Sequence, residues 1–198
     1  MTVLRIISGK RRGFKLAAPD GLDTRPTTDR VKESVFNIIQ THLPCGFVLD
    51  MFAGSGAMGI EALSRGAQGA VFAESNPASL RIVEKNLAGS GLKDGAVVFG
   101  ADSFEMLKRL KSGAATAVTP DGARFDPNNG FDIIFLDPPY NKGLVNKAIE
   151  LICELDFLSP GGIIVAETEV QGEEVSACGF EVRKSAKYGK TVITVLKR

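Results

Sequence analysis

From residue 47 to residue 167 the sequence alternates short apolar segments with segments of helical periodicity, and this alternation limits the folds that the chain can adopt. Apolar runs predict strands at 47–51, 70–73, 97–101, 131–136 and 163–167. Patterns between them predict helices at 57–65, 77–88, 104–110 and 144–157. Strand–helix repeats of this kind are typical of a doubly wound α/β sheet whose strands are mostly parallel.

The two ends of the chain depart from this alternation. Apolar segments around residues 5–7 and 14–16 flank a basic, glycine-bounded stretch and predict an N-terminal β-hairpin. Segments 180–186 and 191–196 predict an antiparallel hairpin that closes the sheet. We therefore expect a hairpin extension over residues 1–24 and an α/β domain over 25–198. Residues 112–130 are rich in Gly, Ala, Pro, Asp and Asn without periodicity, and predict an exposed loop.

Composition indicates the cellular compartment in which the protein is expected to work. No apolar run of membrane-spanning length occurs, and the N-terminus lacks the apolar stretch of a signal peptide. Cys45, Cys153 and Cys178 are scattered without a CxxC pair, so neither a metal site nor a disulfide framework is implied. We expect a protein of the reducing cytoplasm, without membrane or metal.

The charges are unevenly distributed along the chain. Residues 1–32 hold eight Lys/Arg and three Asp, and residues 181–198 hold six Lys/Arg and one Glu. The middle of the chain is acidic, with ten basic and nineteen acidic residues. Two basic ends on an acidic body indicate a polyanion partner at one face, although two solvated hairpins explain the same pattern.

A glycine-rich turn follows the first predicted strand and indicates a nucleotide-like ligand. Gly54, Gly56 and Gly59 spell GxGxxG, which also occurs in nicotinamide-binding proteins. Asp50 stands at the strand end immediately before the turn. A carboxylate there suits a cationic, amine-bearing ligand and would repel a pyrophosphate. The loop therefore favours S-adenosylmethionine.

Acids at the ends of the next two strands extend this prediction. Glu74 follows the strand at 70–73 and can accept hydrogen bonds from both ribose hydroxyls, as in other nucleoside-binding α/β folds. Asp102 closes the third strand and can accept from the adenine amino group. Helix capping is the alternative role of Asp102, with Ser103 as a competing cap.

The tetrapeptide Asp137-Pro138-Pro139-Tyr140 follows a buried apolar strand and points to the reaction. An exocyclic base nitrogen is a poor nucleophile because its lone pair is delocalised into the ring. The Asp137 carboxylate and the Pro138 carbonyl can accept its two N–H groups and stabilise positive charge that develops during methyl transfer. Tyr140 can stack on the unstacked base. A rigid turn with Asp137 as a cap is the structural alternative.

The loop and the tetrapeptide together resemble the amino-methyltransferases that act on nucleic-acid bases. With the segments 25–33, 49–56 and 188–191, the chain is similar over its whole length to the bacterial 16S ribosomal RNA guanine(966)-N2 methyltransferase family. The resemblance implies a seven-stranded methyltransferase (Rossmann-like) sheet with an N-terminal hairpin. It also implies S-adenosylmethionine as donor, and as substrate the guanine N2 of 16S ribosomal RNA in an assembling small subunit.

We assign site residues on these grounds and expect a monomer. Asp137, Pro138 and Tyr140 are the catalytic set, and Lys10, Arg11 and Arg12 are expected to contact RNA phosphates. The resemblance places the segment 25–30 over the cofactor as a lid. The expected cofactor-binding residues are Arg25, Thr27, Asp50, Ala53, Gly54, Ser55, Gly56, Glu74, Ser75, Asp102 and Ser103.

Three alternatives stay open. The first alternative is an adenine-N6 methyltransferase acting on DNA or RNA, because the DPPY tetrapeptide suits the N6 amine of adenine equally well. The chain has little room, however, for a DNA-reading domain. A nicotinamide oxidoreductase and a non-catalytic RNA-binding protein are the others. His42, the one histidine in the sequence, is assigned no role. The 112–130 stretch is longer than the family pattern suggests, and we expect it to alter substrate access.

Overall fold

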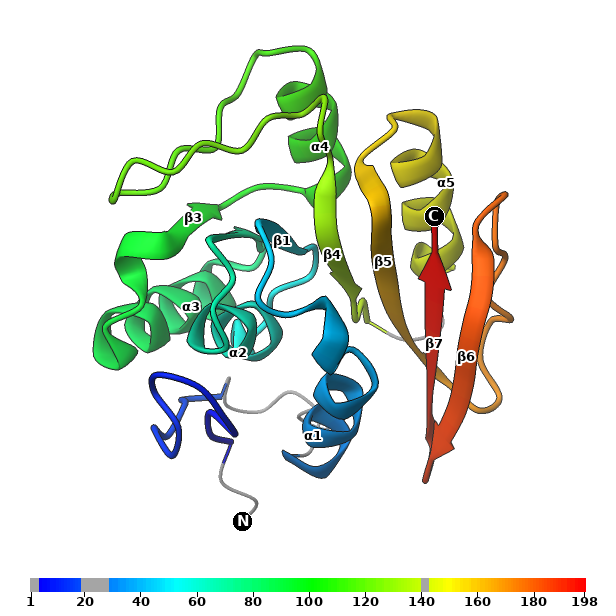
Figure 1. Cartoon of the computed structure of the whole chain (residues 1–198), viewed down its shortest axis with the longest axis horizontal. Coiled ribbons are helices and arrows are strands. Elements are labelled where there is room, and N and C mark those ends of the chain that lie inside the picture. The colour runs from blue at the N-terminus through cyan, green and yellow to red at the C-terminus, as the bar shows by residue number, and fades with distance from the viewer. Residues whose placement is uncertain (1–3, 19–28, 140–142) are drawn as a thin grey trace.

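The computed structural model describes residues 4–18, 29–139 and 143–198 (Figure 1). Its helices are α1 (Asp29–Ile38), α2 (Ala57–Ser64), α3 (Pro77–Ser90), α4 (Ser103–Lys111) and α5 (Leu144–Glu154), with short 3-10 turns η1 (Gln40–His42) and η2 (Lys93–Gly95). Its strands are β1 (Phe47–Asp50), β2 (Gly69–Ala73), β3 (Ala96–Phe99), β4 (Phe131–Leu136), β5 (Leu158–Glu169), β6 (Glu181–Tyr188) and β7 (Thr191–Lys197). None of the helices in these described ranges has both the length and the apolar character of a membrane span.

The seven strands form one sheet in the order β3-β2-β1-β4-β5-β7-β6. Strands β1 to β5 are parallel, and β7 runs antiparallel to both β5 and β6. The predicted doubly wound sheet and its closing hairpin are therefore confirmed. From β1 the chain continues to β2 and β3 on one side of the sheet, and from β4 it continues to β5 on the other side. The direction of the connections thus switches between β1 and β4. Ligands of open α/β sheets bind at the carboxyl ends of the strands at such a switch point.

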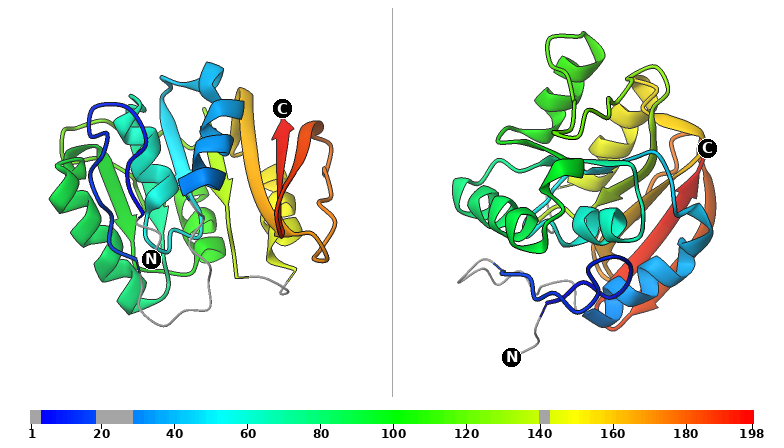
Figure 2. Two further views of the ribbon diagram at one scale, coloured as in Figure 1. Left: turned by 90° about the horizontal axis from the view of Figure 1, so that it is seen from below. Right: turned by 60° about the vertical axis from the view of Figure 1, so that its left-hand side comes forward.

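Side chains alternate along the central strands and form one core on each face of the sheet. Val48 and Phe135 pack on the face covered by α1, α2, α3 and the N-terminal segment. Their neighbours Leu49 and Leu136 pack on the face covered by α4 and α5. Figure 2 shows the helices on both sides of the sheet. Both faces of the parallel strands are thus buried, which explains their continuous apolar sequences.

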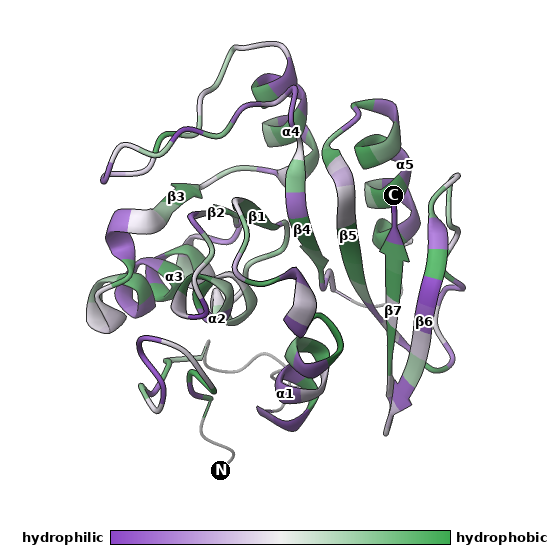
Figure 3. Cartoon of the chain, in the orientation of Figure 1, coloured by the Kyte–Doolittle hydropathy of each residue, from purple (hydrophilic) through white to green (hydrophobic). Residues whose placement is uncertain are grey.

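The edge strand β6 differs from the central strands in character. Figure 3 shows apolar colouring along β4 and β5 but polar segments on β6. Arg183, Lys184 and Lys187 of β6 are exposed. Charged side chains on an edge strand discourage pairing with other chains. Lys187, which lies level with Thr168 near the end of β5, also adds positive charge near the carboxyl edge of the sheet.

The N-terminal segment doubles back on itself as predicted, although its two arms meet at a single antiparallel bridge between Arg5 and Lys15. The Ile6 N–H donates to the Phe14 carbonyl over 2.9 Å, and the Leu16 N–H donates to a carbonyl of the first arm over 2.8 Å. Leu16 and Ile6 are buried in the core beside α1 and α2. The hairpin therefore packs into the same core as the sheet.

A buried carboxylate on α2 fixes this hairpin in place, and we call it, with its four donors, the Glu61 anchor. Glu61 accepts from the Ile7 N–H at 2.7 Å, the Ser8 N–H at 2.9 Å, Arg65 Nε at 2.8 Å and Lys32 Nζ at 3.3 Å. The side chains of Lys32 and Glu61 are fully buried. Burial lowers the pKa of Lys32, and Glu61 opposes that shift. The anchor joins the hairpin, α1 and α2 through one carboxylate.

The predicted loop over residues 112–130 is confirmed, since no helix or strand of the sheet lies there and most of its residues are exposed, but the loop is anchored in the core. Ala117 and Phe125 are buried, and the Phe125 ring stacks on Phe131 with the ring centroids 3.9 Å apart. Phe125 also contacts Phe47, so the segment covers the amino ends of β1 and β4. Its few inward residues are separated by turns, which hides them from periodicity. The segment lies at the edge opposite the end of β4 (Figure 1). Its influence on substrate access stays a prediction, and its position does not support it.

Candidate active site at the carboxyl edge of the sheet

Each of the five parallel strands leads into an acidic residue at the same edge of the sheet. Asp50 ends β1, Glu74 follows β2, Asp102 lies three residues after β3, Asp137 follows β4, and Glu167 lies near the end of β5. Parallel pairing brings these ends together, since β1 lies between β2 and β4, and β5 lies next to β4. The sheet therefore presents a row of carboxyl groups at its switch point.

The glycine loop after β1 turns through two left-handed residues. Gly54 has a φ of 55°, and Gly56, which caps α2, has a φ of 75°. Both conformations favour glycine because residues with a side chain rarely adopt a positive φ. The Ala53 N–H donates to the Ala73 carbonyl over 3.0 Å, and the Gly54 N–H donates to Glu74 Oε2 over 2.8 Å. The loop is thus held against the end of β2.

Asp50 lies beneath this loop and is almost completely buried, with 4% of its surface exposed. Its Oδ2 accepts the Gly59 N–H over 3.0 Å. Burial raises the pKa of Asp50 to about 7; the Gly59 bond opposes this shift and the nearby Glu74 adds to it. A cation beside Asp50 would favour the ionised form. This environment suits an ammonium group and disfavours a pyrophosphate.

Glu74 is held at the end of β2 by two backbone groups. In addition to the Gly54 bond, its Oε1 accepts the Asn76 N–H over 2.7 Å. Asn76 in turn caps α3 by accepting the Ala78 N–H over 2.8 Å. A carboxylate has about four acceptor positions, so two bonds leave Glu74 able to accept from the hydroxyls of a ribose. The adjacent Ser75 is exposed.

Asp102 and Ser103 both have structural partners in the fold. Asp102 Oδ1 accepts the Glu105 N–H over 3.0 Å and caps α4, so the capping alternative is confirmed. Ser103 Oγ donates to the Met51 carbonyl over 2.6 Å and ties α4 to the end of β1. Both residues lie at the carboxyl edge of the sheet, where the adenine contact was predicted. Their contact with a ligand stays a prediction.

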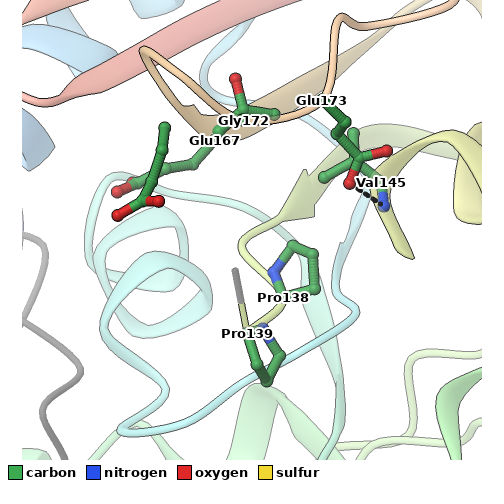
Figure 4. A pocket seen from close by; sticks show the side chains of 8 residues that line it. Pro138, Pro139, Val145, Glu167, Gly172 and Glu173 are labelled. Atoms are coloured by element: carbon green, nitrogen blue, oxygen red, sulfur yellow. Dashed lines mark hydrogen bonds between the residues drawn. The ribbon is translucent and has the colours of Figure 1, made fainter. Parts of the chain in front are cut away.

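The residues after β4 enter a pocket beside β5. Asp137 is half-buried, Pro138 is buried and Pro139 is exposed. Figure 4 shows the two prolines on one side of the pocket and Glu167 and Glu173 on the other. The lining residues are Pro138, Pro139, Val145, Glu167, Thr168, Glu169, Gly172 and Glu173. Tyr140, Arg25 and Thr27 lie outside the described residues.

Glu167 is a candidate residue that the motif analysis did not include. Its exposure is 8%, and Thr191 Oγ1 donates to its Oε1 over 3.5 Å. The sequence did contain a signal, because Glu167 ends the fifth predicted strand and Asp50 lies at the corresponding place near the end of the first. No recognisable motif marks this strand end, whereas a glycine loop follows β1 and the DPPY tetrapeptide follows β4.

Lys10, Arg11 and Arg12 form an exposed basic turn at the tip of the N-terminal hairpin. The Lys10 N–H donates to the Ser64 carbonyl over 2.8 Å, and the Arg11 N–H donates to Ser64 Oγ over 3.0 Å. The backbone of the turn is therefore fixed on the end of α2. His42 lies in η1 before β1, at the amino edge of the sheet, and the structure gives no reason to assign it a role.

The strand order, the glycine turn after β1 and the acids at the strand ends describe an α/β fold with a candidate site at its carboxyl edge. Solved structures named as methyltransferases share this fold. The chain belongs to the family described as Conserved hypothetical protein 95, whose model matches residues 4–197. The family resemblance expected from the sequence is confirmed.

Individual relatives agree with this assignment. The chain is 37% identical over 196 residues to the Bacillus subtilis protein YlbH, covering 98% of this chain and 99% of that one. It is 38% identical over 170 residues to the Ribosomal RNA small subunit methyltransferase D of Escherichia coli, covering 85% and 76%. The solved structure of Escherichia coli yhhF superposes with a TM-score of 0.78 at 31% identity, covering 99% and 98%.

Proposed function

We propose that this protein transfers a methyl group from S-adenosylmethionine to the exocyclic N2 of a guanine in 16S ribosomal RNA, within an assembling small ribosomal subunit. The observation that carries the proposal is the position of Asp137 and Pro138. They follow β4, which pairs directly with β1, so they lie beside the glycine loop. A nucleophile held by one strand end would thus face a donor held by the next.

The residues around the glycine loop fit the donor. The buried Asp50 suits its ammonium group, Glu74 keeps acceptor positions for its ribose, and Gly54 and Gly56 let the backbone approach closely. Bound there, S-adenosylmethionine would supply an electrophilic methyl group. Ala53, Ser55, Ser75, Asp102 and Ser103 complete the proposed cofactor site. Arg25 and Thr27 belong to it by resemblance.

Asp137 and Pro138 act on the nucleophile. The Asp137 carboxylate and the Pro138 carbonyl would accept the two N–H groups of the amine and turn its lone pair away from the ring. The same two acceptors stabilise the positive charge that grows on nitrogen as the new C–N bond forms. The nitrogen then loses one proton, with Asp137 as the nearest base. Tyr140 would stack on the base.

The proposed partner, ribosomal RNA, is supported by exposed basic side chains and by the name of one relative. The exposed Lys10, Arg11 and Arg12 and the exposed cations of β6 suit a phosphate backbone. One relative is named a methyltransferase of small-subunit ribosomal RNA. We propose that the protein acts as a monomer.

Methyl incorporation tests the proposal. The protein is incubated with labelled S-adenosylmethionine and assembled small-subunit particles, free 16S RNA or duplex DNA, and the modified nucleotide is identified by mass spectrometry. We expect N2-methylguanine in the particle. N6-methyladenine in DNA or RNA would support the adenine alternative instead. Asp137→Asn serves as the inactive control, and RNA from a strain lacking the gene should lose the modification.

A further inference from the structure

Helix α3 contacts both the N-terminal hairpin and the glycine loop. Val83, Asn86 and Gly89 follow one another at every third position and share one face of the helix. Val83 approaches the loop, because a Cβ added to Gly56 would lie 3.3 Å from Val83 Cγ1. Gly89 approaches the hairpin, because a Cβ at this position would lie 3.0 Å from the tip of the Phe14 ring. Asn86 lies between these two contacts.

Asn86 forms three hydrogen bonds through its side-chain amide. Its Nδ2 donates to the Ala17 carbonyl over 2.9 Å and to the Ser55 carbonyl over 2.8 Å. Its Oδ1 accepts the Ala17 N–H over 2.8 Å. Asn86 is 2% exposed, and burying an amide costs free energy unless it is hydrogen-bonded. One amide group thus holds the second arm of the hairpin and the glycine loop together.

The bond to Ser55 acts on one peptide unit of the glycine loop. This unit joins Ser55 to Gly56, and its other end is also held, because the Gly56 N–H donates to the Ala53 carbonyl over 2.6 Å. Gly54 and Gly56 have positive φ angles, and glycine adopts positive and negative φ about equally readily. The backbone itself therefore restricts this peptide little, and its orientation depends on its hydrogen bonds. Asn86 supplies such a bond from outside the loop.

We propose that Asn86 is a positioning residue for S-adenosylmethionine, which holds the Ser55–Gly56 peptide in the orientation that admits the cofactor and ties this peptide to the folded hairpin. The assignment rests on the proposed cofactor site and extends it to a residue of α3. Asn86 acts through the loop and not on the reacting atoms. Because the same amide holds Ala17, the hairpin supports cofactor binding in addition to its proposed contact with RNA.

Asn86→Ala and Ser64→Ala form a matched pair of substitutions. Ser64 also ties the hairpin to a helix, because its Oγ donates to the Ser8 carbonyl over 2.6 Å and accepts the Arg11 N–H over 3.0 Å. It lies, however, at the end of α2 that is away from the glycine loop. Urea unfolding measures the stability that each variant loses, and isothermal titration calorimetry measures its affinity for S-adenosylmethionine.

The two variants should differ in cofactor affinity. Asn86→Ala should weaken the binding of S-adenosylmethionine by about 5- to 50-fold, the scale of leaving buried polar groups unpaired. Ser64→Ala should change it by less than about twofold, because distant sites are nearly independent. At saturating cofactor, the single-turnover rate of Asn86→Ala should approach that of the wild type, because the loss belongs to the binding of the donor.

Hydrogen exchange reports on the loop itself. In the cofactor-free protein, the amides of residues 53–57 should exchange faster in Asn86→Ala than in the wild type, and at the wild-type rate in Ser64→Ala. Asn86→Asp has the same size and still accepts the Ala17 N–H, but it cannot donate to Ser55 when ionised. It provides the same exchange measurement if Asn86→Ala does not fold.

The outcomes separate a failure of this proposal from a failure of the proposed function. If both substitutions weaken cofactor binding in proportion to the stability lost, Asn86 has a structural role alone and the proposal is overturned. Unchanged exchange in the loop would overturn it as well. If the wild type binds S-adenosylmethionine but does not methylate guanine in the particle, while Asn86→Ala still binds the cofactor less tightly, the proposed function is wrong and the positioning role stands.

Discussion

We expect Asp50 to make the binding of S-adenosylmethionine depend on pH, because burial raises the pKa of its carboxyl group. At about pH 7 half of the free protein carries a proton on this carboxyl, because burial raises its pKa to about 7. The ammonium group of the proposed cofactor requires the ionised form. The apparent dissociation constant therefore rises with the protonated fraction, and the weakening should be about 25-fold between about pH 7.5 and about pH 5.5.

The replacement Asp50→Asn gives the matched comparison. Asn cannot ionise, so the variant should bind S-adenosylmethionine weakly and with nearly constant affinity over this range. Isothermal titration calorimetry at four or five pH values measures both proteins. A wild-type affinity that changes less than about threefold over this range would refute the reasoning, because a proton held at pKa about 7 must be released on binding.

The stability of the cofactor-free protein should depend on pH in the opposite direction, and should be lower at high pH. Because the folded state raises the pKa of Asp50 from 3.8 to about 7, its contribution to the free energy of unfolding is greatest at acidic pH and is lost as the pH rises through about 7. Asp50→Asn should therefore be more stable than the wild type at about pH 8, and the difference should shrink at about pH 5. Urea unfolding at the two pH values measures the change.

Three further substitutions test the other parts of the site. Glu74→Ala should weaken S-adenosylmethionine binding by roughly 1–3 kcal/mol through loss of charge-assisted bonds, and an unchanged affinity in calorimetry would remove it from the ribose site. Replacing Lys10, Arg11 and Arg12 by Ala should lower RNA affinity and reduce the log–log salt slope by up to about 0.7–0.9 per phosphate contact; an unaltered slope would leave the turn with a structural role alone. Asp137→Asn should slow single-turnover methyl transfer on the order of 10²–10³-fold with much smaller changes in binding, and a nearly normal rate would contradict its role.

The sheet could be predicted because its central strands are buried on both faces and read as continuous apolar runs, whereas its helices are buried on one face and show helical periodicity. Strand β4 matched its predicted range fully, since a continuous apolar run ends abruptly at Asp137. Strand β5 was predicted to begin at Ile163, yet it begins at Leu158. Pro160, Gly161 and Gly162 hide this extension, because the register shifts between β4 and β5 in this region and local propensity does not anticipate such an irregularity.

Contacts between distant segments were beyond the reach of the sequence. The strand-end acids Asp50 and Glu74 could be assigned because each follows a recognisable strand. Lys32 and Glu61 gave no such signal, because each looks like an ordinary charged helix residue and their pairing depends on the packing of α1 on α2. Phe125 was missed for a similar reason, since its aromatic partners are far from it in the sequence.

The Glu61 anchor has a consequence for how the protein can be divided experimentally. Gly9 approaches α2 so closely that a Cβ would lie 1.9 Å from the Ser64 carbonyl oxygen, and Ile7 and Ser8 supply two of the donors to Glu61. A deletion of the hairpin would leave that carboxylate buried beside Lys32 with half of its hydrogen bonds missing. Such a truncation would damage the helix that begins at the glycine loop. Loss of activity in a truncated chain is therefore no measure of RNA binding, and point substitutions at the exposed basic turn are the sound alternative.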